Sequence, residues 1–261
     1  PNTDGSIGQV LATNGSGNVS WVTVSAGALE EITEGSNTGY RIAGRNAASY
    51  ADIGNNAVDL SYSSGLNTTR GASGLVSTAM GYWATASGEF STSMGFMTEA
   101  SGSTSTSMGY MTEASAFAST AMGYNTDASE DASTAMGYDT EASGFRSTAM
   151  GWYTTASGSR STAMGVYTTA SGIYSTAMGD GTTASGAAST AMGAGTNSSG
   201  DFSTAMGYNT EAAGEYSTAM GSNTTAKSYA EVAIGLYNTD YTSASTSSWQ
   251  SGDRLFVIGN G

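Results

Sequence analysis

The sequence contains no cysteine and no histidine, a single proline, and only seven lysine and arginine residues. Without cysteine the chain has no disulfides and no thiolate metal ligands, and without histidine it lacks the Ser-His and Cys-His catalytic sets and the common zinc sites. The 21 acidic residues give a formal charge of -14. A chain this acidic lacks the electrostatic footprint of a protein that binds nucleic acid or an anionic membrane surface.

Long hydrophobic runs are also missing, since no apolar stretch approaches the roughly 20 residues of a membrane-spanning helix. Low hydrophobicity with 11% charged residues is a composition that disordered chains share. Here, however, the 13 methionines and most aromatic residues recur at a fixed spacing. That regularity favours an ordered repeat protein.

What the sequence has in abundance is glycine, 37 residues, and the motif Ser-Thr-Ala-Met-Gly. Its apolar fourth residue recurs every 14 residues without insertion or deletion, at Met80, Met94, Met108, Met122, Met136, Met150, Met164, Met178, Met192, Met206, Met220 and Ile234. Strict spacing gives each unit the same rise and rotation, which predicts a solenoid.

A 14-residue period fits two heptads, but the glycine and threonine in every unit and the lack of regularly spaced leucines exclude a coiled coil. In the stretch Ser133–Met136, alternation puts Thr and Met on one face and Ser and Ala on the other, as in a strand. Asn125–Ala128 alternates in the same way. Each unit therefore predicts two short strands, with corners at Met-Gly-Tyr and Ala-Ser-Gly, that stack in parallel about 4.8 Å apart.

A 14-residue coil is narrow, and we expect the methionine row, from Met80 to Met220 with Ile234, to fill it as a structural core ladder, because Met is unbranched and adaptable. The alanines beside it would then point outward as a flat apolar stripe. Such a stripe is normally covered, and symmetric self-association is a simple way to cover it. The rod from Met80 to Ile234 would be about 50 Å long.

The pattern S-x-A-φ-G…x-A-x-G, in which φ is apolar, resembles the head repeat of YadA-type trimeric autotransporter adhesins. The stretch STAMGYDTEASGFRSTAMG, Ser133 to Gly151, is an example, and the resemblance extends over residues 74–235. It implies an all-β, left-handed parallel β-roll that forms a homotrimer. It also implies an extracellular location, on a cell surface or on a phage or injection-system particle. The chain has Thr-Ala-Met where Val-Ala-Ile is common, and EVAIG at Glu231–Gly235 restores the usual form.

The flanks divide the chain further. Residues 4–24 have the pattern of a hairpin and resemble a segment of fibre-like proteins from bacteria and their phages. In residues 39–63 the repeat is degenerate, and Ile53-Gly54 resembles Met-Gly with a register slip of one residue, which predicts a cap with a bulge. Residues 247–261 resemble the segment that follows such heads in tail fibres. We expect an N-terminal fibre segment (1–25), degenerate coils and cap (26–73), the repeat β-roll (74–235) and a C-terminal neck (236–261).

The two residues before each motif vary from unit to unit, which predicts exposed turns on a rigid scaffold, a usual place for recognition. These turns contact either a receptor or the neighbouring chain. The candidate receptor contacts are Phe90, Phe117, Phe145, Arg146, Arg160, Tyr174, Phe202, Tyr216 and Tyr229.

Two further rows accompany the repeat. One is aromatic and either stacks on sugars or packs along the rod, with packing the favoured interpretation; it comprises Tyr82, Phe96, Tyr110, Tyr124, Tyr138, Trp152 and Tyr208. The other is the acidic row Glu99, Glu113, Asp127 and Glu141, which either binds Ca²⁺ or forms a solvated face. The solvated face is favoured because the glycine- and aspartate-rich Ca²⁺-binding repeat is missing.

The sequence thus predicts a non-enzymatic trimeric fibre head that presents a binding surface for a cell-surface protein or glycan receptor. Its partners would be itself, as a homotrimer, and the receptor, with no cofactor, metal, nucleic acid or membrane insertion. The C-terminal segment favours a phage-tail-like or injection-system fibre over a bacterial surface autotransporter adhesin. Other classes are an ice- or surface-binding solenoid, disfavoured because Thr154 and Thr155 face opposite ways, and a glycan-cleaving enzyme, disfavoured because the carboxylates are spread over repeats.

Overall fold

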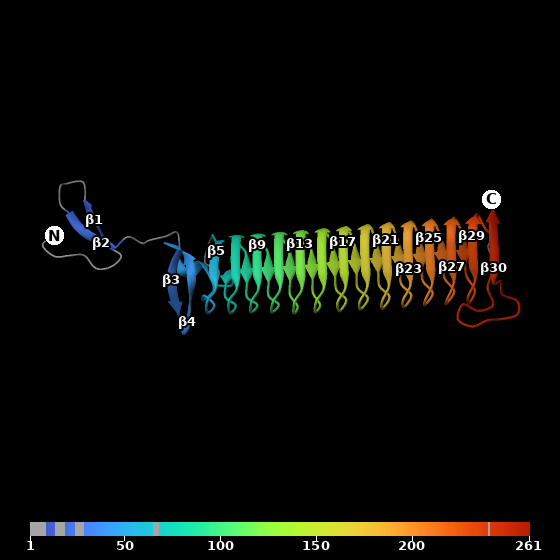
Figure 1. Ribbon diagram of the computed structural model, residues 1–261, viewed down its shortest axis with the longest axis horizontal. Helices are drawn as coiled ribbons and strands as arrows, with labels where there is room; N and C mark the ends of the chain where they lie inside the picture. The colour runs from blue at the N-terminus through green and yellow to red at the C-terminus, as the bar shows by residue number, and fades with distance from the viewer. Residues whose placement is uncertain (1–8, 14–18, 24–28, 65–67, 240) are drawn as a thin grey trace.

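The computed structural model describes residues 9–13, 19–23, 29–64, 68–239 and 241–261, and its repeats form a straight rod of stacked coils (Figure 1). These residues form a parallel β-solenoid of about 14 turns with no α-helix, only one 3₁₀ turn at Ala47–Ser49. The prediction of an all-β parallel solenoid is confirmed. The N-terminal hairpin is also confirmed, since β1 (Gln9–Thr13) pairs antiparallel with β2 (Val19–Thr23); its predicted turn lies outside the described residues.

Each coil contributes two strands, as predicted; one spans five residues, here called long, and the other two residues, here called short. The long strands are β7 (Thr78–Tyr82), β9 (Thr92–Phe96), β11 (Thr106–Tyr110), β13 (Thr120–Tyr124), β15 (Thr134–Tyr138), β17 (Thr148–Trp152), β19 (Thr162–Val166), β21 (Thr176–Asp180), β23 (Thr190–Ala194), β25 (Thr204–Tyr208), β27 (Thr218–Ser222) and β29 (Val232–Leu236). The short strands are β6 (Gly71–Ala72), β8 (Thr85–Ala86), β10 (Glu99–Ala100), β12 (Glu113–Ala114), β14 (Asp127–Ala128), β16 (Glu141–Ala142), β18 (Thr155–Ala156), β20 (Thr169–Ala170), β22 (Thr183–Ala184), β24 (Asn197–Ser198), β26 (Glu211–Ala212) and β28 (Thr225–Ala226).

The strands stack into two parallel ladders in strict register. The long strands belong to a 16-stranded sheet and the short strands form a 12-stranded one. Within the repeats each residue pairs with the one 14 positions later, so Met136 lies beside Met150 and Gly137 beside Gly151. Identical side chains therefore form rows along the rod.

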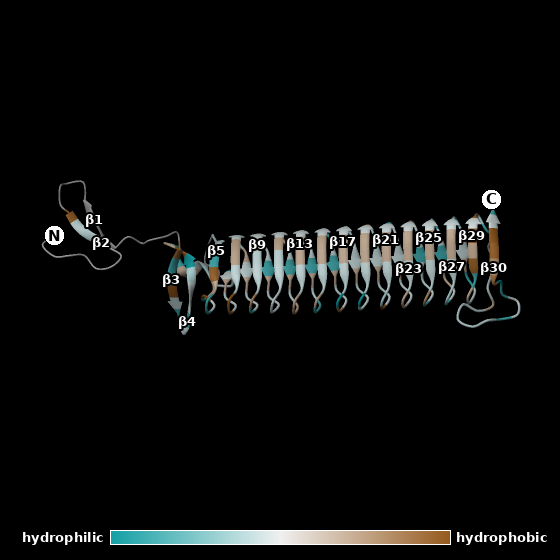
Figure 2. Ribbon diagram, viewed as in Figure 1, coloured by the Kyte–Doolittle hydropathy of each residue, from teal (hydrophilic) through white to brown (hydrophobic). Residues whose placement is uncertain are grey.

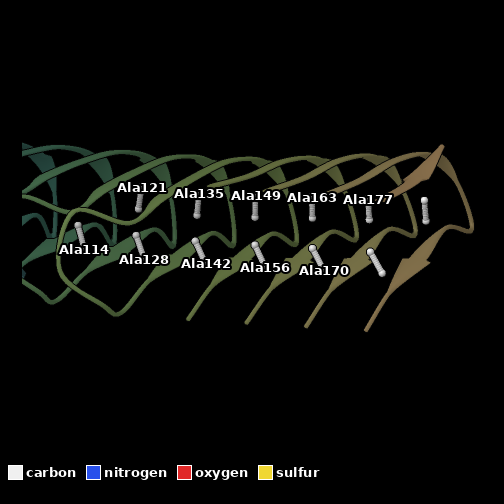
Figure 3. Close-up of a cluster of buried hydrophobic side chains, with 12 residues drawn as sticks. Ala114, Ala121, Ala128, Ala135, Ala142, Ala149, Ala156, Ala163, Ala170 and Ala177 are labelled. Carbon is white, nitrogen blue, oxygen red and sulfur yellow. The ribbon is translucent and has the colours of Figure 1, made fainter. Parts of the chain in front are cut away.

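The interior of the coil is filled by alanine, serine and threonine. The alanines of both sheets point toward one another across the narrow interior (Figure 3), and Ala135, Ala142 and Ala149 are 0% exposed. Threonines such as Thr140 are buried with them. Where serine replaces the long-strand alanine, its hydroxyl finds a partner inside the coil: Ser107 Oγ lies 2.7 Å from Thr112 Oγ1.

The prediction that the methionine row fills the coil is therefore wrong for the single chain. The alternation was correct, because Thr and Met do share one face, but that face points outward. The row from Met80 to Met220 and Ile234 is partly exposed, reaching 38% at Met94. The physical reason is volume: two sheets joined by turns of a few residues leave an interior that small side chains fill completely, so the longer thioether must lie outside.

The predicted corner at Met-Gly-Tyr is also misplaced. The glycine lies within the long strand, where Gly151 has φ 132°, and the corner comes two residues later, at non-glycine residues in the left-handed region such as Tyr153 (φ 52°). The other corner follows Ser-Gly, as expected, and its second variable residue is again left-handed, with φ 55° at Arg146.

The N-terminal end of the solenoid is closed by an antiparallel hairpin, β3 (Leu29–Glu34) and β4 (Asn37–Ile42), whose second strand pairs parallel with β5 (Val58–Tyr62). Arg41 is buried there between two carboxylates, 3.1 Å from Glu34 and 3.2 Å from Asp59. These contacts give the first coil a covered end.

The prediction that Ile53-Gly54 takes the place of Met-Gly is wrong. Gly54 occupies the Ser-Gly turn, because its amide donates to the carbonyl of Ala72 at 2.9 Å. The residue that continues the methionine row is Leu60 of β5, which pairs with Met80. Leu60 and Met80 are separated by six residues more than one repeat, so the 14-residue spacing does not predict that they pair.

The C-terminal segment adds one more rung, β30 (Phe256–Asn260), which pairs parallel with β29 so that Val232 lies beside Phe256. These last two strands are the more hydrophobic end of the sheet (Figure 2). The connection is held by Glu231, which is buried, accepts from the Ser228 amide at 3.0 Å and lies 3.3 Å from Arg254 Nε.

Candidate binding surface

The variable turns lie between each short strand and the next long strand, along one edge of the rod, where Figure 1 shows them as loops at the start of the long strands. Each turn is tied to the one before it: the amide of Arg146 donates to the carbonyl of Asp131 at 2.9 Å, and that of Arg160 to Phe145 at 2.7 Å. The turns therefore form a regular, rigid series. Because the turns lie at this edge, most of the candidate receptor-contact side chains are exposed to solvent.

The structure divides the nine candidate residues into two clusters and two separate side chains. Phe145, Arg146, Arg160 and Tyr174 form a cationic and aromatic cluster over three successive turns. Phe202, Tyr216 and Tyr229 form an aromatic cluster, with Phe202 and Tyr216 stacked at 5.0 Å between ring centroids and Tyr229 edge-on to Tyr216 at 5.5 Å. Phe90 and Phe117 are exposed on earlier turns, apart from both clusters.

The aromatic row at the end of the long strands is stacked on itself. From Tyr82 through Phe96, Tyr110 and Tyr124 to Tyr138, successive rings lie 4.7–5.3 Å apart and within 6° of parallel. Each inner ring has both faces covered by its neighbours and presents only its edge to solvent. Sugars bind aromatic rings through the face, so this geometry supports the packing interpretation.

A second aromatic row, at the left-handed corner, was missed by the sequence reasoning. Tyr153 and Tyr167 stack there at 5.3 Å and 7°, and Tyr153 also lies edge-on to Tyr138. A hydrogen bond to Asp139 raises the pKa of the Tyr153 hydroxyl. This corner position also recurs every 14 residues. Its residue types vary too much, from Met111 to Gly181, for the sequence to reveal an aromatic row.

The acidic row follows the short strands, where Glu99, Glu113, Asp127 and Glu141 are register neighbours. Beside three of them is a groove of 360 Å³, also lined by Asn125 and Asp139. Burial raises the pKa of Asp127, and Glu141 raises it further; burial, with Asp127 and Glu99, likewise raises that of Glu113. Among the described residues, no group of three or more acidic side chains has the arrangement of a metal site.

The raised pKa values predict that this row destabilises the rod at neutral pH. For a carboxyl whose folded-state pKa is raised, the cost of ionisation is fully present above the folded pKa and disappears as the pH falls below the unfolded value, near 4. Asp127→Asn should therefore stabilise the protein at pH 7 by about 0.2–1 kcal/mol and have no such effect at pH 3. Thermal unfolding at the two pH values measures both.

The matched control is Glu211→Gln, because Glu211 occupies the same row but its neighbours there, Asn197 and Thr225, are uncharged. It should give a smaller gain at pH 7. Equal gains from both substitutions would show that repulsion along the row is not the cause.

The part of the chain that the structure describes holds no helix long and apolar enough to cross a membrane.

In the comparison with family models, the one described as YadA head domain repeat (2 copies) matches residues 72–96, 114–140, 142–168, 170–196 and 198–224. Together these segments make up just over half of the chain. The comparison with curated proteins found no match.

Proposed function

Since the chain belongs to the family of YadA head domain repeats, we propose that it is the head of a homotrimeric fibre and presents a receptor-binding surface along its variable turns. YadA-type repeats on a β-solenoid are typical of surface-exposed structural adhesins rather than of enzymes. The main support for receptor binding is the row of exposed aromatic and arginine side chains on turns that the solenoid holds in fixed positions. Recognition commonly uses such loops on rigid scaffolds.

Three copies would pack through the outward Thr and Met side chains of the long strands, which we call the Thr–Met face. This replaces the predicted alanine stripe, because the alanines are enclosed within the coil. The face is flat, uncharged and continuous from Thr78 to Met220, and it continues into Val232 and Ile234. A long uncharged face of this kind is a natural surface for closed self-association.

Adhesion is tested by removing the variable side chains without altering the coils. We expect replacement of Phe202, Tyr216 and Tyr229 by serine, together with Arg146, Arg160 and Tyr174, to reduce binding to cells or to a glycan array by at least about tenfold, as loss of an anchoring cluster does. Circular dichroism and light scattering should be unchanged, because these side chains lie outside the coil.

A control that removes three aromatic side chains from the other row replaces Tyr110, Tyr124 and Tyr138 by serine. These residues belong to the stacked row and should affect thermal stability more than binding. Full binding by the six-residue variant would contradict the assignment of the receptor surface to the turns.

We further propose that the head belongs to a phage-tail-like or injection-system fibre rather than to an autotransporter. The support is the resemblance of residues 247–261 to the segment that follows such heads in tail fibres. The coding sequence downstream tests this: a self-cleaving chaperone domain is expected, and a membrane anchor would contradict it.

A further inference from the structure

Arg146 and Arg160 are the only cationic residues between Arg70 and Lys227, a stretch that carries most of the acidic residues of the chain. They lie at the same position of two successive turns, so their backbones are one coil spacing apart, about 4.8 Å. Two neighbouring positive charges on an otherwise acidic rod form a distinct surface.

Aromatic rings hold both guanidinium groups. Arg160 lies 5.5 Å from the ring centre of Phe145 and 5.3 Å from that of Tyr174, and its Nη1 donates to the Tyr174 hydroxyl at 3.1 Å. Arg146 lies 4.8 Å from the Phe145 ring centre. Cation–π contacts of this kind orient a guanidinium while leaving N–H groups at its edge for a ligand.

Within the described residues, no carboxylate forms an ion pair with Arg146 or Arg160, in contrast to Arg41 and Arg254, which do have acidic partners. Both side chains are exposed, and apart from the Arg160 Nη1 that bonds to Tyr174 their donors are available to a ligand. Their turns are fixed by the backbone bonds to the preceding coils, so little ordering is needed for binding.

We propose that this cluster binds a carboxylated sugar at the end of a glycan. One or both guanidinium groups take the carboxylate, which suits their planar, paired donors. Tyr174, 58% exposed, offers its ring to the C–H face of the sugar, because only the methyl group of Ala188 follows it in the row. The inference rests on the proposed receptor-binding function and names the ligand class of one part of that surface.

Charge favours a terminal sugar over an acidic protein surface. A protein partner would bring many carboxylates close to a rod that carries a net charge of -14, and repulsion would act over the whole contact. A terminal acidic sugar brings one carboxylate, which lies over the two arginines and within reach of an aromatic ring.

The test uses the full chain and two probes, lactose capped with N-acetylneuraminic acid and lactose alone. The native protein should bind only the acidic probe, more weakly at high salt. Arg146→Gln with Arg160→Gln should weaken that binding at least tenfold, and Tyr174→Ala, which keeps both charges, several-fold. The control is Arg45→Gln, because Arg45 also lies over a ring, 4.8 Å from that of Tyr62, but belongs to the cap; it should bind as the native chain does.

Three results would overturn the inference: no binding of the acidic probe, equal binding by the double variant with native circular dichroism, or binding of a polyglutamate peptide in preference to the sugar. In each case adhesion to cells is measured in parallel. If the native chain still adheres through its turns, only the sugar assignment fails; if it adheres to no cell type, the proposed function fails as well.

Discussion

Replacing Gly151 by alanine should remove at least about 3 kcal/mol of stability, the largest effect we expect from adding a single methyl group to this protein. Gly151 has φ 132°, a conformation that L side chains rarely adopt, and a Cβ there would overlap the carbonyl oxygen of Gly165 in the next coil. The new atom cannot be accommodated by a side-chain movement, because its neighbour is backbone. The coils on either side would have to separate, and the midpoint of urea unfolding should fall accordingly.

Gly181→Ala is the matched control. Gly181 also has a positive φ, 61°, but the nearest atom to an added Cβ is the Gly195 amide nitrogen at 4.0 Å. Other coils place Asn125, Asp139 or Tyr153 at this corner with similar φ values. The cost should be near 1 kcal/mol. Equal losses from the two substitutions would contradict the proposed close approach of the long strands at Gly151.

Met150→Asp should prevent assembly of the proposed trimer while leaving the fold of the single chain intact. In one chain Met150 is on the outer face, so a carboxylate there remains solvated. On the Thr–Met face of three associated copies, it would bring three carboxylates together without partners, at a cost of at least about 3 kcal/mol. Light scattering should report a monomer, and circular dichroism should still report β-structure.

The control is Thr155→Asp, which places the same negative charge on the next short strand, β18. Its row already carries Glu141, so the added carboxylate faces solvent, and the trimer should persist. A Met150→Asp protein that remains trimeric with an unchanged melting temperature would show that the copies associate through another face.

Periodicity alone determines the fold class of this chain. An unbroken spacing of 14 residues requires equal coils, and the alternation at Ser133–Met136 together with a glycine in every unit selects strands over helices. The exposed turns followed from sequence variation within one chain, since positions that face a common interior cannot vary freely. These features are local or repetitive, so one sequence suffices to detect them.

Only the tertiary structure decided which face of the alternation is inside. Sequence indicates that Ala135 and Met136 point opposite ways, but hydrophobicity alone favours Met as the core residue, and the narrow gap between the two sheets admits Ala instead. The pairing of Leu60 with Met80 and the ring contacts of Arg160 likewise depend on which coils lie side by side. Distances between sheets and between turns arise from packing in three dimensions, and a one-dimensional pattern carries no measure of them.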